Sequence, residues 1–207
     1  MRATIDGIDP AAFAGMGIGV SGGGTHLGRA IALGLAAAGA TVVVFGRRAE
    51  PLEETAELAA GARGVVIPEI ADQHRDDDLA RVLERIEREA GHVGGWVNNA
   101  YGGPSSPFLE LDRDAVERSV ESALADVILA TEAAARRMVA SGKGGAIVNV
   151  ASMYGLVSPQ PDTYARHPQF HNPPAYGAAK AGVIEFTRYA ACHLARDGVR
   201  VNCVSPG

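Results

Sequence analysis

A tyrosine and a lysine lie four positions apart in "PAYGAAKAG", residues 174–182. If this segment is helical, the side chains of Tyr176 and Lys180 leave the same face and their ends can meet. A phenol beside a fixed positive charge loses its proton more readily, so the pair has the chemistry of a general acid/base. The same spacing also arises by chance on surface helices, so the surrounding elements must decide between the two interpretations.

Apolar and amphipathic segments alternate along the chain. The pattern predicts strands at 15–22, 41–45, 64–68, 94–100, 145–152 and 199–207, and helices at 26–39, 50–60, 75–90, 112–140 and 174–197. Strands that alternate with helices imply a parallel sheet covered on both faces. We therefore predict an α/β fold with a doubly wound, Rossmann-like parallel sheet, forming a single domain over residues 1–207.

The composition excludes several classes of protein. The chain has 207 residues, 47% of them hydrophobic, and a formal net charge of −5. This charge argues against a nucleic-acid partner, and no segment has the pattern of a signal core or a membrane span. Cys192 and Cys203 lie in apolar segments without metal-type spacing, which indicates reduced core cysteines. We expect a cytoplasmic protein with no membrane partner and no bound metal.

The segment "SGGGTHLGRA", residues 21–30, stands between the first strand and the first helix. Glycines at this place let a pyrophosphate approach the positive N-terminus of the helix. An ordinary tight turn is the alternative interpretation. The predicted nucleotide contacts of this glycine turn are Gly22, Gly24, Thr25, Leu27 and Gly28.

The end of the second strand bears on the type of nucleotide. It reads "VVVFGRR", with Gly46 where a carboxylate would hold the ribose 2′-hydroxyl of NAD, followed by Arg47 and Arg48. A guanidinium can bind a 2′-phosphate through charged hydrogen bonds. We predict NADP(H) in preference to NAD(H), with two solvated arginines at a helix start as the alternative.

These features together resemble the short-chain dehydrogenase/reductase family along nearly the whole chain. The matching pieces are "SGGGTHLG", "NNA" at 98–100, "IVNVAS" ending at Ser152, "YGAAK" at 176–180 and "VRVNCVSPG" at the end. The resemblance implies an oxidoreductase that transfers hydride between NADP(H) and a small carbonyl or secondary-alcohol substrate. It implies that Tyr176 is the general acid/base, that Lys180 assists it and holds the nicotinamide ribose, and that Ser152 hydrogen-bonds the substrate oxygen.

The resemblance also implies further nucleotide contacts. Asn98 and Ala100 would line the adenosine side, Glu69-Ile70 occupies the place that contacts adenine, and Pro206-Gly207 would flank the nicotinamide. The proline-rich stretch 156–174 is expected to be a long loop on the substrate side, with Tyr164, Phe170, His171 and Asn172 as candidate contacts. A metal site at His167 and His171 is disfavoured, because Pro168 opposes the helix that their spacing would need.

Three residues depart from the family pattern. His26 replaces a glycine of the turn, and Gly24 is the candidate for the close approach to phosphate. Ala123 replaces an asparagine that anchors a water in the proton relay, with Ser122 beside it. Tyr101 replaces the glycine of "NNAG", either as a pocket wall or as plain packing.

The family's assembly and length suggest two more expectations. Members commonly form tetramers through the helices that correspond to 112–140 and 174–197, so we expect a homo-oligomer, a tetramer or dimer. Members also continue past the "PG" with a substrate-covering segment, a helix and an edge strand, and these C-terminal elements are absent from this sequence. The alternative hypothesis is a nucleotide-binding pseudoenzyme without turnover. It is motivated by Ala123, by His26 and by the missing C-terminal elements.

Overall fold

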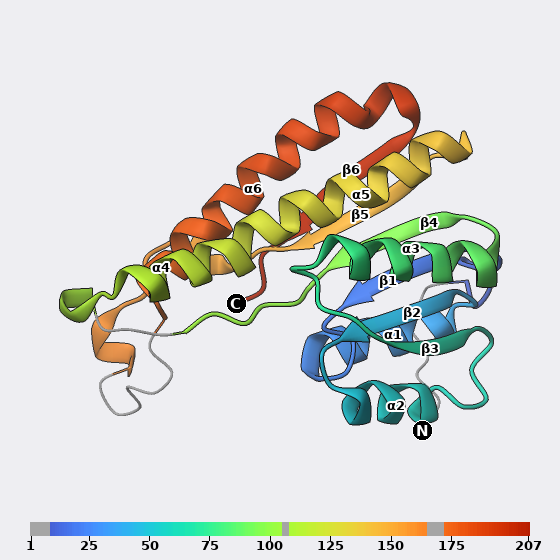
Figure 1. The fold of residues 1–207 in the computed structure, drawn as a ribbon, viewed down its shortest axis with the longest axis horizontal. Helices are drawn as coiled ribbons and strands as arrows, with labels where there is room; N and C mark the ends of the chain where they lie inside the picture. Colours follow the sequence, from blue (N-terminus) through green and yellow to red (C-terminus); the bar gives the residue numbers. More distant parts are fainter. Residues whose placement is uncertain (1–8, 105–107, 165–171) are drawn as a thin grey trace.

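The computed structural model describes residues 9–104, 108–164 and 172–207. Its centre is one sheet of six strands in the order β3-β2-β1-β4-β5-β6, and every neighbouring pair is parallel (Figure 1). The strands are β1 (Gly17–Ser21), β2 (Thr41–Gly46), β3 (Val65–Ile70), β4 (Val93–Asn98), β5 (Gly145–Val150) and β6 (Val199–Val204). The predicted doubly wound α/β fold is confirmed.

Helices cover both faces of this sheet because its strands are apolar on both sides. Successive residues of a strand point to opposite faces, so Val42 and Val44 join one core while Val43 and Phe45 join the other. On the first face lie α1 (His26–Ala37) and α2 (Ala49–Leu58), and on the second lie α3 (Asp76–Ala90), α5 (Asp126–Ser141) and α6 (Pro174–Leu194). The long α5 and α6 run side by side over β5 and β6 (Figure 1).

The order of the strands creates a crevice at one edge of the sheet. The chain moves outward from β1 through β2 to β3, then crosses back to β4 on the other side of β1. Loops that leave the carboxyl ends of β1 and β4 therefore diverge, and this switch point is where doubly wound folds bind their ligands.

Two predicted elements differ from those observed. Strand β3 continues beyond Pro68 to Ile70, because an edge strand tolerates a residue that cannot donate to the ladder. The helix expected at 112–140 is instead α4 (Arg113–Val120), a π-helical turn at Glu121–Ala125, and α5. A π-helical turn adds a residue to a helical repeat and commonly marks a functional place.

The cysteine prediction needs a partial correction. Both cysteines are free, as predicted, but Cys192 is exposed on α6 and Cys203 is only partly buried. An alanine-rich helix does not reveal from its composition which face is outward.

No helix of the described chain combines the length and apolarity needed to cross a membrane.

Candidate functional site

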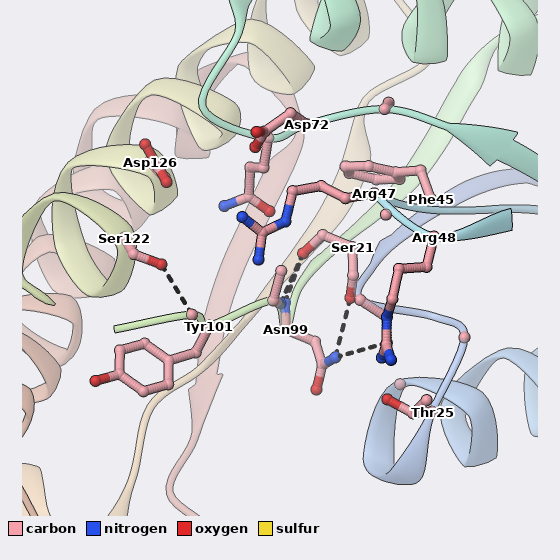
Figure 2. A pocket seen from close by; sticks show the side chains of 18 of the residues that line it. Ser21, Thr25, Phe45, Arg47, Arg48, Asp72, Asn99, Tyr101, Ser122 and Asp126 are labelled. Atoms are coloured by element: carbon pink, nitrogen blue, oxygen red, sulfur yellow. Dashed lines mark hydrogen bonds between the residues drawn. The ribbon is translucent and has the colours of Figure 1, made fainter. Parts of the chain in front are cut away.

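A cavity of about 660 Å³ opens at the switch point between β1 and β4 (Figure 2). Its walls come from the glycine turn, the ends of β2 and β4, the segment after β3, and the π-helical turn. The predicted nucleotide contacts that line it are Gly22, Gly24, Thr25, Leu27, Gly28, Arg47, Arg48 and Ala100. The structure thus brings together residues from three separate predicted contact segments.

The glycine turn leaves the start of α1 open toward the cavity. Thr25 is the N-cap residue, but its hydroxyl makes no capping hydrogen bond, and the first turn of α1 carries no acidic residue. Gly28 packs against the turn so closely that an added β-carbon would lie 2.2 Å from the Gly22 carbonyl oxygen. Unpaired N–H groups at a helix start form a site for an anion such as a pyrophosphate.

His26 occupies the place of the expected glycine in a backbone conformation that glycine favours. Its φ is +45°, and the residue is exposed and lines the cavity. Left-handed backbone is unfavourable for a residue with a β-carbon, so the turn keeps its glycine-like shape at some cost in stability.

Hydrogen bonds between side chains and backbone hold the glycine turn in place. The Ser21 hydroxyl accepts hydrogen bonds of 2.9 Å from the backbone N–H groups of Asn99 and Ala100, joining β1 to the end of β4. The Asn99 amide donates to the Ser21 carbonyl at 2.9 Å. From the other side, the Arg29 guanidinium donates to the Gly24 carbonyl at 2.7 Å.

Asn98 does not line the cavity, contrary to the prediction. Its side chain is 1% exposed, and its Nδ2 donates to Thr131 Oγ1 and Asn149 Oδ1, both at 2.8 Å. Trp96 Nε1 donates to Asn98 Oδ1 at 2.8 Å. Because consecutive strand residues face opposite ways, the cavity-lining asparagine is the next one, Asn99.

The end of β2 brings positive charge to the cavity. Figure 2 shows Arg47 reaching into the cavity between Asp72 and Ser21, while Arg48 lies nearer to the glycine turn and Thr25. Gly46, the last residue of β2, also lines the wall. The absence of a side chain there leaves the two guanidinium groups without a neighbouring acidic group from β2.

The residues that follow β3 also differ from the prediction. Ile70 is 57% exposed and lines a separate shallow hollow beside α2, and Glu69 pairs with Arg81. The cavity is lined instead by Asp72 and Gln73, two and three residues later, because β3 runs further than expected. Gln73 Oε1 is buried without a hydrogen-bond partner in the described chain, so an acceptor is available there.

An imidazole–carboxylate cluster that the sequence analysis missed closes the cavity near α5. His74 Nδ1 lies 3.1 Å from Asp126 Oδ1, and His74 Nε2 lies 3.4 Å from Glu121 Oε1. The hydrogen bond and charge of Asp126 raise the pKa of His74, with Glu121 adding to the effect. Burial raises the pKa of the Asp126 carboxyl. Only the fold brings His74 to these carboxylates, which lie about fifty residues away in the sequence.

Tyr176 and Lys180 meet as their spacing predicts, in the first turns of α6. Lys180 Nζ lies 5.5 Å from the centre of the Tyr176 ring. The lysine is 3% exposed and donates to the Val150 carbonyl at 2.6 Å. Burial lowers the pKa of Lys180 to about 8. A lysine held this way keeps two further protons for other acceptors.

Ser152 reaches the same region through a turn that packs against α6. It precedes the 3₁₀ turn Met153–Gly155, and its Oγ accepts a hydrogen bond from the Tyr154 N–H at 3.2 Å. An added β-carbon at Gly177 would lie 2.9 Å from the Tyr154 carbonyl oxygen. The small residue between Tyr176 and Lys180 therefore permits the close approach of the Ser152 turn.

Pro206-Gly207 lies beside this turn. The Met153 N–H donates to the Pro206 carbonyl at 2.9 Å. Ser152, Tyr176, Lys180, Pro206 and Gly207 are not among the residues that line the cavity described above. They lie next to it on the side of Tyr101, since the Tyr101 ring lines the cavity and also contacts the Tyr176 ring, with centroids 4.7 Å apart.

The predicted substrate-side loop is described only in part. Tyr164 ends a 3₁₀ turn at Pro161–Tyr164, with its ring centroid 6.5 Å from that of Tyr154. Phe170, His171 and the alternative metal ligand His167 lie outside the described residues. Asn172 precedes α6, which begins two residues later.

The cavity residues fit a nicotinamide nucleotide. The open start of α1 suits a pyrophosphate, the guanidinium groups at β2 suit an additional phosphate, and the orphaned Gln73 acceptor suits a base with an amino group. The line of residues from this cavity through Tyr101 to Tyr176 and Lys180 fits an extended ligand that ends near the phenol.

Comparison with known proteins agrees with this geometry. The family model for short chain dehydrogenase matches residues 18–207. The chain is 37% identical over 189 residues to a cis-4-hydroxycyclohexanecarboxylate dehydrogenase of Sinomonas cyclohexanicum, covering 91% of this chain and 71% of that protein. It is 36% identical over 184 residues to a (5R,7aS)-5-hydroxy-7a-methyl-1-oxo-2,3,5,6,7,7a-hexahydro-1H-indene-carboxyl-CoA reductase of Mycobacterium tuberculosis, covering 88% and 66%. A solved short-chain type dehydrogenase/reductase from Mycobacterium marinum superposes with a TM-score of 0.85 at 31% identity, covering 96% of this chain and 75% of that one.

Proposed function

The chain belongs to the short-chain dehydrogenase/reductase family, and from this we propose that it transfers hydride between NADP(H) and a carbonyl or secondary-alcohol substrate. The observation that carries the proposal is the burial of Lys180 beside the Tyr176 ring. A buried ammonium is unfavourable for stability, and such strain is typical of a site kept for chemistry.

Three side chains divide the proton chemistry. Tyr176 would give a proton to the carbonyl oxygen in reduction and take it from the alcohol in oxidation. The Lys180 ammonium would stabilise negative charge on the Tyr176 oxygen, and its remaining protons would bind ribose hydroxyls. The Ser152 hydroxyl uses a lone pair for Tyr154, so its proton is free to bind the substrate oxygen. The nicotinamide ring supplies or accepts the hydride when it is bound.

The family implies a nicotinamide nucleotide, and the arginines favour the phosphorylated form. Arg47 and Arg48 line the cavity directly after Gly46, which stands where a carboxylate would select NAD. A guanidinium can bind a 2′-phosphate with two charged hydrogen bonds. Asp72 and the Gln73 acceptor would face the adenine, and the open start of α1 would bind the pyrophosphate.

The names of the relatives suggest where a substrate search should begin. The relatives from Sinomonas cyclohexanicum and Mycobacterium tuberculosis are both named for a hydroxylated ring compound that bears a carboxyl group or its CoA thioester. We propose alicyclic hydroxy-carboxylates, free or as thioesters, as the first substrate class to test.

A homo-oligomer remains a prediction that the surface supports. Leu129 and Val139 on α5 and Tyr189 on α6 are large side chains that stand exposed in the single chain. Pairing of these helices between copies would cover them. A dimer or tetramer in sedimentation analysis is the expected result, and a monomer would contradict the prediction of a homo-oligomer.

The cytoplasmic location also stays a prediction.

One observation favours a second function, nucleotide binding without turnover. Ala123, at the place of the family's relay asparagine, is fully buried in the π-helical turn, and its methyl group cannot hold a water. Such a protein would bind the nucleotide and act as a sensor or subunit.

Two measurements separate these functions. Titration with NADPH and NADH, followed by nicotinamide fluorescence, should show tighter binding of NADPH. Turnover is then measured with alicyclic hydroxy-acids, their ketones and their CoA thioesters. Turnover of any of these supports the dehydrogenase. Tight NADPH binding with no turnover across the panel would favour the non-catalytic function. Equal binding of both nucleotides would show that the arginines do not select NADPH over NADH.

A further inference from the structure

Tyr101 stands between the nucleotide cavity and the proposed acid/base. It follows the end of β4, is 37% exposed and lines the cavity with Gly102 and Ser122. Its ring meets the Tyr176 ring at an interplanar angle of 61°, with centroids 4.7 Å apart. This is the edge-to-face arrangement that aromatic pairs prefer. Figure 2 shows the Tyr101 ring pointing away from Arg47 and Thr25.

The Tyr101 ring is fixed from two other directions. Its hydroxyl lies 3.2 Å from Ser119 Oγ, and Ser119 is a buried residue of α4. The phenol also folds over Gly103, where an added β-carbon would lie 2.5 Å from the Tyr101 oxygen. The neighbouring Gly102 N–H donates to Ser122 Oγ at 3.0 Å (Figure 2). The ring is therefore anchored to the loop after β4 and to α4 independently of Tyr176.

Tyr176 lies in the first turn of α6, which begins at Pro174, and its side chain is only partly buried. Its backbone N–H donates to the Pro173 carbonyl at 3.0 Å, so the backbone is held there and the orientation of the ring depends on side-chain contacts. A general acid/base must nevertheless hold its oxygen in one orientation, since small displacements at a reacting centre lower the rate strongly.

Tyr101 is suited to support rather than to proton transfer. Burial raises the pKa of the Tyr101 phenol, and the neighbouring Tyr176 raises it further, against the opposing effect of the Ser119 hydrogen bond. The Tyr101 phenol therefore keeps its proton over the working range of pH.

We propose that Tyr101 is a positioning residue that holds the Tyr176 ring edge-to-face and so fixes the phenol oxygen for proton transfer. The inference rests on the proposed function, because that function assigns the proton to Tyr176. It gives a role to the ring that replaces the glycine expected at this position.

Kinetics of three variants test the proposal. Tyr101→Ala removes the ring, Tyr101→Leu keeps bulk without a ring, and Tyr101→Phe keeps the ring without the hydroxyl. The Ala and Leu variants should lower kcat, measured at saturating NADPH, by about tenfold, a larger factor than the change in the dissociation constant of NADPH that loss of a cavity-wall ring brings. The Phe variant should restore most of kcat. A kcat unchanged in Tyr101→Ala, or lowered equally in Tyr101→Phe, would overturn the proposal.

A second readout needs no turnover. In protein labelled with ¹³C at the tyrosine ζ-carbon, Tyr176→Phe assigns the Tyr176 signal. That signal should be single and similar in the wild type and Tyr101→Phe, and shifted or split in Tyr101→Ala. An identical Tyr176 signal in all three proteins contradicts the positioning role. A wild type without turnover would count against the proposed function alone, because the spectra still decide the role of Tyr101.

Discussion

The nucleotide half of the site and its proton-transfer half are held by different physical means. In the nucleotide half, at the ends of β1, β2 and β4, side-chain-to-backbone hydrogen bonds join the glycine turn to the end of β4, as those between Ser21 and Asn99 do. In the proton-transfer half, at β5 and α6, a buried ammonium donates to the carbonyl of Val150. The first half relies on several side-chain-to-backbone hydrogen bonds around a partly exposed cavity, and the second places a charge in the interior.

This difference predicts how each half responds to change. A site made of many backbone contacts should lose affinity in modest steps, because each contact contributes little alone. A site built on one buried charge should lose turnover sharply and gain stability when the charge is removed.

Tyr176→Phe should abolish the reaction while sparing nucleotide binding. The variant keeps the ring against Tyr101 but lacks the oxygen that exchanges the proton. We expect turnover to fall by about a thousandfold, within the range of general acid/base catalysis. Steady-state kinetics with NADPH titration measures both properties. Turnover that survives within tenfold would assign the proton to another group.

Lys180→Met should lower turnover and raise stability. Folding lowers the pKa of Lys180 from the ordinary 10.5 to about 8, so below pH 8 the folded state carries the whole penalty of the buried charge. The shift corresponds to about 3 kcal/mol, and losing the bond to Val150 offsets about 1 kcal/mol of the gain. We expect a net gain of about 2 kcal/mol in the free energy of unfolding at pH 7.

The pH dependence gives this prediction its control. Between pH 8 and 10.5 the folded protein loses the Lys180 proton before the unfolded chain does, so the wild type becomes more stable relative to the variant. The advantage of Lys180→Met in urea unfolding should therefore shrink at pH 10. A variant that is less stable at both pH values would show that the charge is well compensated in the folded state.

Arg47→Ser should weaken the binding of NADPH and leave the binding of NADH unchanged. Loss of charged hydrogen bonds to a 2′-phosphate should raise the dissociation constant of NADPH by about 10- to 30-fold. Arg63→Ser is the matched control, since Arg63 packs near Gly39 and is not among the residues that line the cavity. Equal weakening of both nucleotides would mean that Arg47 holds a part that they share.

The fold was predictable because each element carries its own signal. The β-branched run at 41–45 and the glycine turn before α1 are local patterns, and the chain order of strands and helices follows from them. The spacing of Tyr176 and Lys180 was equally local. The errors arose where the position of an element in the sheet determines its length. Pro68 is an example, because only an edge strand accommodates a proline.

Residues of the site were missed where a one-residue shift or a distant contact matters. The sequence "NNA" does not tell which asparagine faces the core, and the end of β3 was placed too early to find Asp72 and Gln73. The His74 cluster and the Tyr101 contact join segments far apart in the sequence. Side-chain periodicity within one element contains no information about such pairs.

The smallest predicted effect lies in the nucleotide half, at the one described residue other than glycine with a positive φ. His26→Gly should relieve left-handed backbone worth about 1–2 kcal/mol, offset by about 0.5–1 kcal/mol for the greater freedom of glycine in the unfolded chain. We expect the free energy of unfolding to rise by about 0.5–1 kcal/mol in urea titration. His26→Ala separates strain from the imidazole, because it keeps the β-carbon and should leave stability near that of the wild type. If both variants gain equally, the imidazole rather than the backbone is the unfavourable element, and the nucleotide half, like the proton-transfer half, sacrifices stability to keep a side chain at the site.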